Sequence, residues 1–266
     1  MKIVAIGGGE IGRKNVMPDG SVFQYPVETI EIEQKIIRLT EKKNPKLLLL
    51  ATAANDSEIY LDTVERHFGE RLGCMVSWLQ LATQNPTENE IQKAILETDI
   101  IYVGGGNTNK MIQIWKDKGA DKVLKQALDS GVILSGISAG ANCWFKHYST
   151  DSLAIDAGVE NGTMLSIADG LGFINGVCVP HTMSEPARVP YAKEMLMTKY
   201  PNDVFYGIDD FTALIFENGK MRSLVSATGK EKGAKVRRLS MANGQVVESV
   251  ISTTPQPFFE KSDFCR

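Results

Sequence analysis

The sequence is poor in the residues that build metal and disulfide sites. Its 266 residues include four cysteines and three histidines, and no two cysteines have the short spacing of a zinc or redox motif. The longest apolar stretch, 47–54, runs at once into Asn55 and Asp56, well short of the roughly 20 apolar residues of a membrane span. We therefore expect reduced thiols, no metal site and no contact with a membrane.

A cationic surplus and a secretory signal are also missing. Lysine and arginine number 29 against 32 acidic residues, for a formal net charge of -3, so little draws the chain onto a phosphate backbone. The first six residues are followed by three glycines, and this segment lacks the long apolar region and the cleavage site of a signal peptide. These features predict a cytoplasmic protein without a nucleic-acid partner.

Short apolar runs alternate with longer amphipathic segments, as in a parallel sheet flanked by helices. The predicted strands are 2–6, 47–52, 75–81, 100–103, 132–137 and 176–179, and the predicted helices are 28–41, 57–67, 88–97, 107–128, 139–145 and 185–198. After about residue 204, strands at 204–208, 213–216, 223–227, 235–239 and 245–251 are joined in part by Asn-Gly dipeptides, which are typical of hairpins. We predict one α/β domain, with a mainly parallel core over 1–217 and a hairpin-rich, antiparallel extension over 218–266.

The glycines at 7–12 have the spacing of a dinucleotide-binding turn after a strand. The context does not fit, because residues 18–20 (Pro-Asp-Gly) interrupt the helix that should follow. No second strand ends in an acidic residue at the expected distance. We interpret these glycines as tight backbone geometry, and we expect no cofactor.

The segment Gly136-Ile137-Ser138-Ala139-Gly140 lies between a predicted strand and a predicted helix. Gly-x-Ser-x-Gly at such a junction is the nucleophile elbow, which exposes the serine hydroxyl above the sheet. The amide of Ala139 would then point at a developing oxyanion. A tight turn with a helix-capping serine is the alternative that this pattern alone leaves open.

A second glycine cluster, Gly104-Gly105-Gly106, ends the preceding strand and is followed by Asn107. Neighbouring parallel strands place the loops at their carboxyl ends side by side. The amide of Gly105 or Gly106 is therefore a candidate second oxyanion donor, and Asn107 is a candidate helix cap.

A serine nucleophile needs a base, and histidine is the usual one. His67 belongs to a polar helical segment and His147 follows the wrong end of the elbow helix, whereas His181 follows a strand at the sheet edge where loops converge. We therefore choose His181. The acid that orients it stays open among Asp151, Asp156 and the pair at 209–210.

The Gly-Gly-Gly-Asn loop, the serine elbow and the Val-Pro-His segment at 179–181 resemble, in order and approximate spacing, the peptidase E family of serine peptidases. This family shares the fold of class I glutamine amidotransferases, with serine in place of cysteine. The N-terminal glycines and residues 207–214 also look like family or cyanophycinase-like segments. The resemblance covers roughly residues 1–217.

The resemblance implies that Ser138 is the nucleophile and His181 the base. Residues 150–151 resemble the segment that carries the family's acid, so it implies Asp151 as the acid, with Asp210 as second choice. Family peptidases prefer dipeptides or short peptides with an N-terminal aspartyl residue, and Arg188 falls where a basic side chain would bind that carboxylate. Asn107 and Asp210 complete the expected substrate-binding set, and a surface position is the alternative for Arg188.

These features predict a cofactor-free serine peptidase that cleaves small peptides through an acyl-serine intermediate. Alternatives are a cyanophycinase-like or isoaspartyl peptidase, a catalytically silent binding module and, with less support, a dinucleotide-dependent oxidoreductase. A glutamine amidotransferase is disfavoured because the nearest thiol, Cys143, lies inside the following helix. The chain is longer than the compact family members, with extra sequence at residues 13–26 and after residue 216. These two segments are candidates for a wall of the site or for a homodimer contact.

Overall fold

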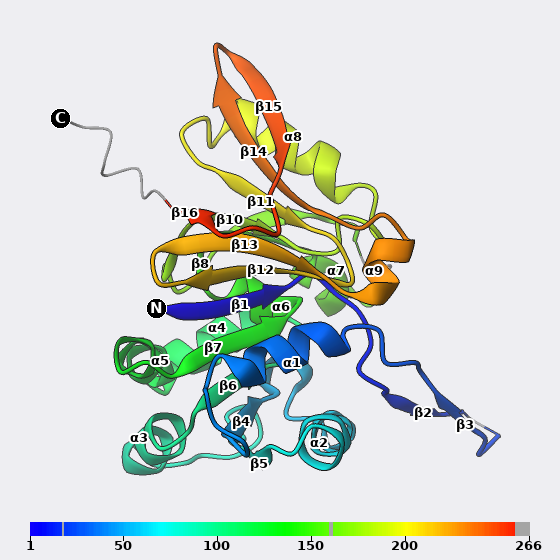
Figure 1. Cartoon of the computed structure of the whole chain (residues 1–266), viewed down its shortest axis with the longest axis vertical. Helices are drawn as coiled ribbons and strands as arrows, with labels where there is room; N and C mark the ends of the chain where they lie inside the picture. The colour runs from blue at the N-terminus through cyan, green and yellow to red at the C-terminus, as the bar shows by residue number, and fades with distance from the viewer. Residues whose placement is uncertain (18, 160–161, 259–266) are drawn as a thin grey trace.

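A computed structural model describes residues 1–17, 19–159 and 162–258, and it shows two mixed sheets with helices on their faces (Figure 1). The larger sheet has the strand order β16-β13-β12-β1-β7-β6-β4-β5. Its parallel part consists of β1 (Lys2–Ile6), β7 (Ile133–Ile137), β6 (Ile100–Val103), β4 (Lys46–Leu50) and β5 (Met75–Trp78). Its antiparallel edge consists of β12 (Thr212–Glu217), β13 (Lys220–Val225) and β16 (Gln256–Pro257).

The smaller sheet has the order β15-β14-β11-β10-β8-β9. Its strands are β8 (Phe145–Thr150), β9 (Ser166–Asp169), β10 (Ile174–Val179), β11 (Phe205–Ile208), β14 (Val236–Ala242) and β15 (Gln245–Val250). Strands β8, β10 and β11 are mutually parallel, and the others are antiparallel to their neighbours. The short link from β11 to β12 joins the two sheets, so residues 209–211 lie where both sheets meet.

Helices cover both faces of the parallel strands, which explains why the strands read as continuous apolar runs. Ile3 and Ala5 face a core that includes residues of α3 (Glu88–Leu96), α4 (Thr108–Asp117) and α5 (Ala120–Asp129). Val4 and Ile6 face the opposite core, which includes residues of α1 (Ile30–Arg38) and α2 (Glu58–Val64). The other helices are η1 (Thr52–Ala54), η2 (Glu65–Arg71, a π-helix), α6 (Ala139–Asn142), α7 (Ser152–Ala157), α8 (Arg188–Thr198) and α9 (Ala227–Glu231).

The predicted fold class is confirmed, and most predicted elements are present with bounds that differ by a few residues. The predicted helix at 107–128 is wrong as one element, because Gly119 adopts a left-handed conformation (φ 70°) and divides it into α4 and α5. The predicted helix at 139–145 is also too long, since α6 ends at Asn142 and β8 begins at Phe145. The antiparallel strands after residue 204 divide between the edges of both sheets.

Residues 13–17 and 19–26 form a projecting arm rather than part of either sheet. Strands β2 (Lys14–Val16) and β3 (Val22–Gln24) pair with each other as a hairpin, which extends away from the body of the molecule (Figure 1). No helix in the described part of the chain combines the length and hydropathy of a transmembrane span. Cys74, Cys143 and Cys178 are buried free thiols, and Cys265 lies outside the described residues.

Candidate active site

Ser138 forms a sharp turn between β7 and α6. Its φ of 58° and ψ of -111° are unusual for a residue with a side chain. Glycines on both sides allow the turn: a Cβ at Gly136 would lie 2.5 Å from the carbonyl oxygen of Gly140, and a Cβ at Gly140 would lie 2.1 Å from that of Val103. The strand-to-helix elbow that the sequence predicts is therefore present.

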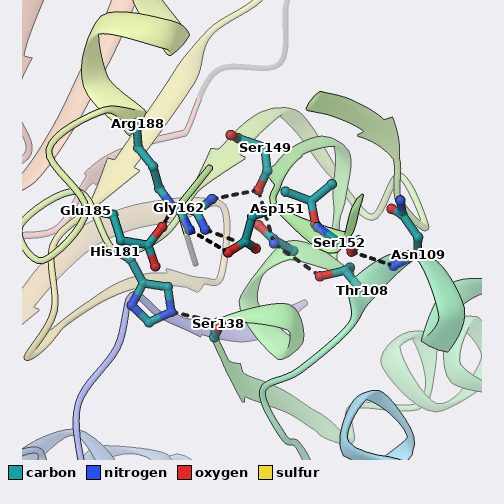
Figure 2. A network of polar contacts seen from close by, with 12 residues as sticks. Thr108, Asn109, Ser138, Ser149, Asp151, Ser152, Gly162, His181, Glu185 and Arg188 are labelled. Atoms are coloured by element: carbon teal, nitrogen blue, oxygen red, sulfur yellow. Dashed lines mark hydrogen bonds and ion pairs between the residues drawn. The ribbon is translucent and has the colours of Figure 1, made fainter. Parts of the chain in front are cut away.

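His181 comes to Ser138 from the other sheet. It follows β10 directly after Pro180, and its own φ is positive at 56°. Its Nε2 lies 2.9 Å from the hydroxyl oxygen of Ser138, as Figure 2 shows. The strained conformation of both residues brings a hydroxyl and an imidazole into hydrogen-bond contact across the junction of the sheets.

Asp210 is the carboxylate beside this imidazole. Its Oδ1 lies 2.8 Å from Nδ1 of His181, and its Oδ2 accepts a hydrogen bond of 2.9 Å from the amide of Ser184. Burial alone would raise the pKa of Asp210, but the hydrogen bonds from His181 and Ser184 outweigh it and lower the pKa to about 2. The carboxylate is therefore ionised and can only accept, so Nδ1 carries the proton and Nε2 faces Ser138 as an acceptor.

The neighbouring acid, Asp209, points into a different set of contacts. It is fully buried and accepts hydrogen bonds from Thr182, Arg237 and the amide of Lys235. These contacts tie the β11–β12 link to β14. Of the two adjacent carboxylates, Asp209 fixes the loop and Asp210 contacts the histidine.

The N-terminal glycine cluster makes room for the pair of His181 and Asp210. A Cβ at Gly8 would lie 2.1 Å from Oδ1 of Asp210 and 2.6 Å from Nδ1 of His181. The carbonyl of Gly8 also accepts a hydrogen bond from the amide of Phe211. The cluster leads into the β2–β3 hairpin rather than into a helix, which is not the context of a dinucleotide-binding turn.

Asp151 does not reach His181, which corrects the sequence-based first choice of acid. Its Oδ1 lies 3.3 Å from Arg188, and its Oδ2 accepts a hydrogen bond of 2.8 Å from the amide of Gly162. Arg188 is buried rather than on the surface, and it also contacts Glu185 at 2.5 Å and the carbonyl of Ser149 at 3.3 Å. Figure 2 shows this network beside Ser138 and His181. The guanidinium thus already faces two carboxylates, as expected for a buried charge.

Asn107 serves as a helix cap. Its side-chain oxygen accepts a hydrogen bond of 3.0 Å from the amide of Lys110, and its amide group donates one of 2.8 Å to Asp156. Both functional groups of this buried side chain are therefore engaged within the protein. The structure gives it the capping role that the sequence also allowed.

The candidate oxyanion donors lie on both sides of the serine. Ala139 is the first residue of α6, where an amide has no acceptor inside the helix. Gly105 packs on the serine, since a Cβ there would lie 3.3 Å from Cβ of Ser138. Its amide donates a hydrogen bond of 3.0 Å to the hydroxyl of Tyr60. Gly106 packs instead against the carbonyl of Ala53.

A cavity of about 410 Å³ opens beside Ser138 and His181. Apolar walls come from isoleucines and from Tyr60 and Tyr102, and the base of the β2–β3 hairpin closes one side. Glu10 and Arg13 form an ion pair of 2.7 Å on that wall. Residues 13–15 thus help to wall the site, one of the two roles considered for this segment.

The other histidines and the elbow cysteine lie outside this arrangement. His147 pairs with Asp169 on the surface. His67 is buried, which corrects its expected solvated position, and its Nδ1 lies 2.6 Å from the Arg71 guanidinium. Cys143 is fully buried and burial raises its pKa, so its thiol is not suited to the role of an amidotransferase nucleophile.

Three features of the site were not found from the sequence. The contacts of Tyr60, Ser184 and Gly8 depend on segments far apart in the chain. The choice of Asp210 over Asp151 depends on the same packing, although both acids were among the candidates. Two signals pointed to Asp210: the paired acids at 209–210 follow a strand, where functional groups gather, and the family resemblance gave Asp210 as its second choice of acid.

A serine, a histidine and a carboxylate in consecutive hydrogen-bond contact on an α/β fold define a hydrolase-type site. Comparisons with known proteins agree: the profile of Peptidase family S51 matches residues 20–224. The chain is 32% identical over 247 residues to the uncharacterized peptidase YgaJ of Bacillus subtilis (strain 168), covering 93% of this chain and 95% of the relative. The chain therefore belongs to peptidase family S51, which confirms the predicted family and makes it a peptidase of the hydrolase class.

Two solved structures share the fold. A peptidase from an acI-B1 Actinobacterium superposes with a TM-score of 0.68 at 21% identity, covering 97% of this chain and 96% of that one. A protein from Listeria monocytogenes EGD-e, whose name provisionally assigns it to peptidase E, gives a TM-score of 0.59 at 18% identity and covers 84% and 98%. At these identities the likeness concerns the fold.

Proposed function

We propose that this chain is a serine peptidase that hydrolyses dipeptides or short peptides through an acyl-Ser138 intermediate. The observation that carries the proposal is the unbroken contact from Ser138 Oγ to His181 Nε2 (2.9 Å) and from His181 Nδ1 to Asp210 (2.8 Å). This order of groups supplies a nucleophile, a base and a carboxylate that orients the base.

Acylation can begin because Nε2 of His181 is free to accept the proton of Ser138. As Ser138 Oγ attacks the scissile carbonyl carbon, its proton passes to Nε2 of His181. The carbonyl oxygen becomes an oxyanion, and the free amide of Ala139 at the start of α6 is the backbone donor that we assign to it. When the tetrahedral intermediate collapses, the C–N bond breaks and His181 gives its proton to the departing amine.

Deacylation repeats these steps with water. His181 takes a proton from a water molecule, whose oxygen attacks the ester carbon, and the second tetrahedral intermediate releases the acid and returns the proton to Ser138. One water is consumed for each peptide bond cleaved. Asp210 stays ionised throughout and stabilises the imidazolium that forms in each half of the reaction.

The cavity supports a small substrate. Its volume of about 410 Å³ and its closure by the hairpin base favour a short peptide over a folded protein. The preference for an N-terminal aspartyl residue rests on the family resemblance, because Arg188 is already engaged by Asp151 and Glu185. A substrate panel therefore has to decide among aspartyl, isoaspartyl and cyanophycin-type peptides.

The test is a hydrolysis assay on Asp-Leu, Ala-Leu, isoaspartyl-Leu and a β-aspartyl-arginine dipeptide, with the released amine quantified. The proposal predicts hydrolysis of at least one dipeptide by the wild type and loss of that activity in Ser138→Ala. Activity that survives in Ser138→Ala would contradict the assigned nucleophile. Failure to cleave any of these dipeptides, or a longer peptide pool, would favour a silent binding module.

A further inference from the structure

The hydroxyl of Tyr60 occupies an unusual position next to the serine. It accepts the hydrogen bond of Gly105, with 3.0 Å between the amide nitrogen and the phenolic oxygen. A phenol also has one proton to donate, and no contact among the described residues uses the proton of Tyr60. Tyr60 and Ser138 line the same cavity.

The ring of Tyr60 is held in place by the glycine loop. A Cβ at Gly104 would lie 2.8 Å from Cζ of Tyr60 and 3.1 Å from its hydroxyl oxygen, so the ring packs directly on the backbone of this glycine. A Cβ at Gly105 would lie 3.8 Å from Oγ of Ser138. Two adjacent glycines of one loop therefore contact the phenol and the serine, Gly104 on the side of Tyr60 and Gly105 on the side of Ser138.

The hydroxyl also keeps its proton over the working range of an enzyme. Burial raises the pKa of Tyr60 to about 12, although the hydrogen bond from Gly105 acts in the opposite direction. A neutral phenol that accepts one hydrogen bond becomes a stronger donor of the next, because consecutive hydrogen bonds polarise each other.

We propose that Tyr60 is a catalytic residue that donates its hydroxyl hydrogen bond to the oxyanion formed during attack by Ser138. In this arrangement Gly105 acts through Tyr60, and the amide of Ala139 supplies the other donor. The phenolic O–H bond does not break, so no proton is transferred at this step. The inference rests on the proposed serine mechanism and adds to it a side-chain donor, a type that oxyanion sites do use.

Tyr60→Phe removes one oxygen and leaves the ring that packs on Gly104. The matched control is Tyr206→Phe, which removes the hydroxyl of a buried tyrosine outside the cavity. The second-order rate of phosphonylation of Ser138 by a small alkyl fluorophosphonate is measured by intact mass, together with kcat and KM for a cleaved peptide. Melting curves and near-ultraviolet circular dichroism check that each variant is folded.

We expect Tyr60→Phe to lower kcat and the phosphonylation rate by about 10²-fold, the usual cost of one oxyanion donor, with KM within threefold of the wild type. Tyr206→Phe should stay within twofold. A Tyr60→Phe rate that is unchanged overturns the proposal. A faster rate also overturns it, since the hydroxyl would then be blocking the amide of Gly105.

The two proposals fail in different ways. If the wild type is phosphonylated and Ser138→Ala is not, the serine mechanism stands, and an unaffected Tyr60→Phe variant removes only the role of Tyr60. If the wild type neither reacts with the probe nor cleaves peptides, both proposals are wrong. A loss in Tyr60→Phe that appears in KM alone, with kcat unchanged, assigns Tyr60 to substrate binding and likewise overturns its role as an oxyanion donor.

Discussion

Replacing Asp210 by Asn distinguishes the two acids that the family resemblance implied for the site, Asp151 and Asp210. An amide in place of the carboxylate can donate to Nδ1 of His181, which favours the tautomer whose Nε2 carries a proton and cannot accept one from Ser138. A substitution of this kind in a Ser-His-Asp site lowers kcat by about 10⁴-fold. We expect a loss of this size in Asp210→Asn while the protein remains folded.

Asp151→Asn is the paired variant. Asp151 contacts Arg188 and not His181, so removing its charge should destabilise the buried guanidinium without changing the reactivity of Ser138. A small fluorophosphonate reports that reactivity without requiring peptide recognition. The phosphonylation rate should collapse in Asp210→Asn and stay within threefold of the wild type in Asp151→Asn. The reverse pattern would refute the assignment of the acid.

The lowered pKa of Asp210 adds a test by pH. A fall from the ordinary 3.8 to about 2 corresponds to about 2 kcal/mol of folding free energy. This stabilisation is present above pH 4 to 5 and is lost as the pH falls through about 2, because the unfolded chain binds the proton first. The difference in unfolding free energy between the wild type and Asp210→Asn should therefore shrink between pH 5 and pH 2. A difference that does not change with pH would contradict the ionised, hydrogen-bonded carboxylate.

Two further substitutions test the surroundings of the site. Gly8→Ala places a methyl group 2.1 Å from Asp210 and 2.6 Å from His181. We expect kcat to fall by about 10²-fold or more, as for a lost catalytic contact, while the melting curve stays cooperative. An unchanged kcat would contradict the close packing of Gly8 on these two side chains. Glu33 is fully buried 3.5 Å from His67, and burial raises its pKa. The wild type therefore loses stability as the pH rises above 4.5, because the unfolded chain releases the Glu33 proton before the folded chain does. Urea titrations should show that the unfolding free energy of Glu33→Gln, relative to the wild type, grows from pH 5 to pH 8. A difference that stays constant would show that contacts in the folded protein offset the burial of the carboxylate.

Local patterns predicted the parts of the fold that local physics determines. The apolar strands 2–6 and 100–103 and the capped helix near 88–97 are present because burial on both faces and a capping box act over a few residues. The two Asn-Gly hairpins after residue 217 are also present, because a two-residue turn requires a positive φ at both positions and both dipeptides adopt it. Strand β8 was missed because its mixed sequence, with Lys146 and His147, does not show an apolar run.

In the active site, too, the residues set by local sequence were predictable and those set by tertiary packing were not. Ser138 was predictable, since the elbow needs small residues at fixed spacing within one turn. The acid was not, because Asp210 lies 29 residues beyond His181 and reaches it only through the junction of two sheets. Tyr60 lies 45 residues before Gly105, on a helix whose sequence carries no catalytic motif. Contacts of this kind depend on tertiary packing that sequence spacing does not encode.

The central claim is that His181 activates Ser138 for nucleophilic attack. Its most direct test is intact-mass spectrometry after treatment with a small fluorophosphonate, applied to the wild type, Ser138→Ala and His181→Ala. The account predicts one phosphonyl adduct on the wild type and none on either folded variant. An adduct that persists in Ser138→Ala, or a wild type that remains unmodified while folded, would contradict it.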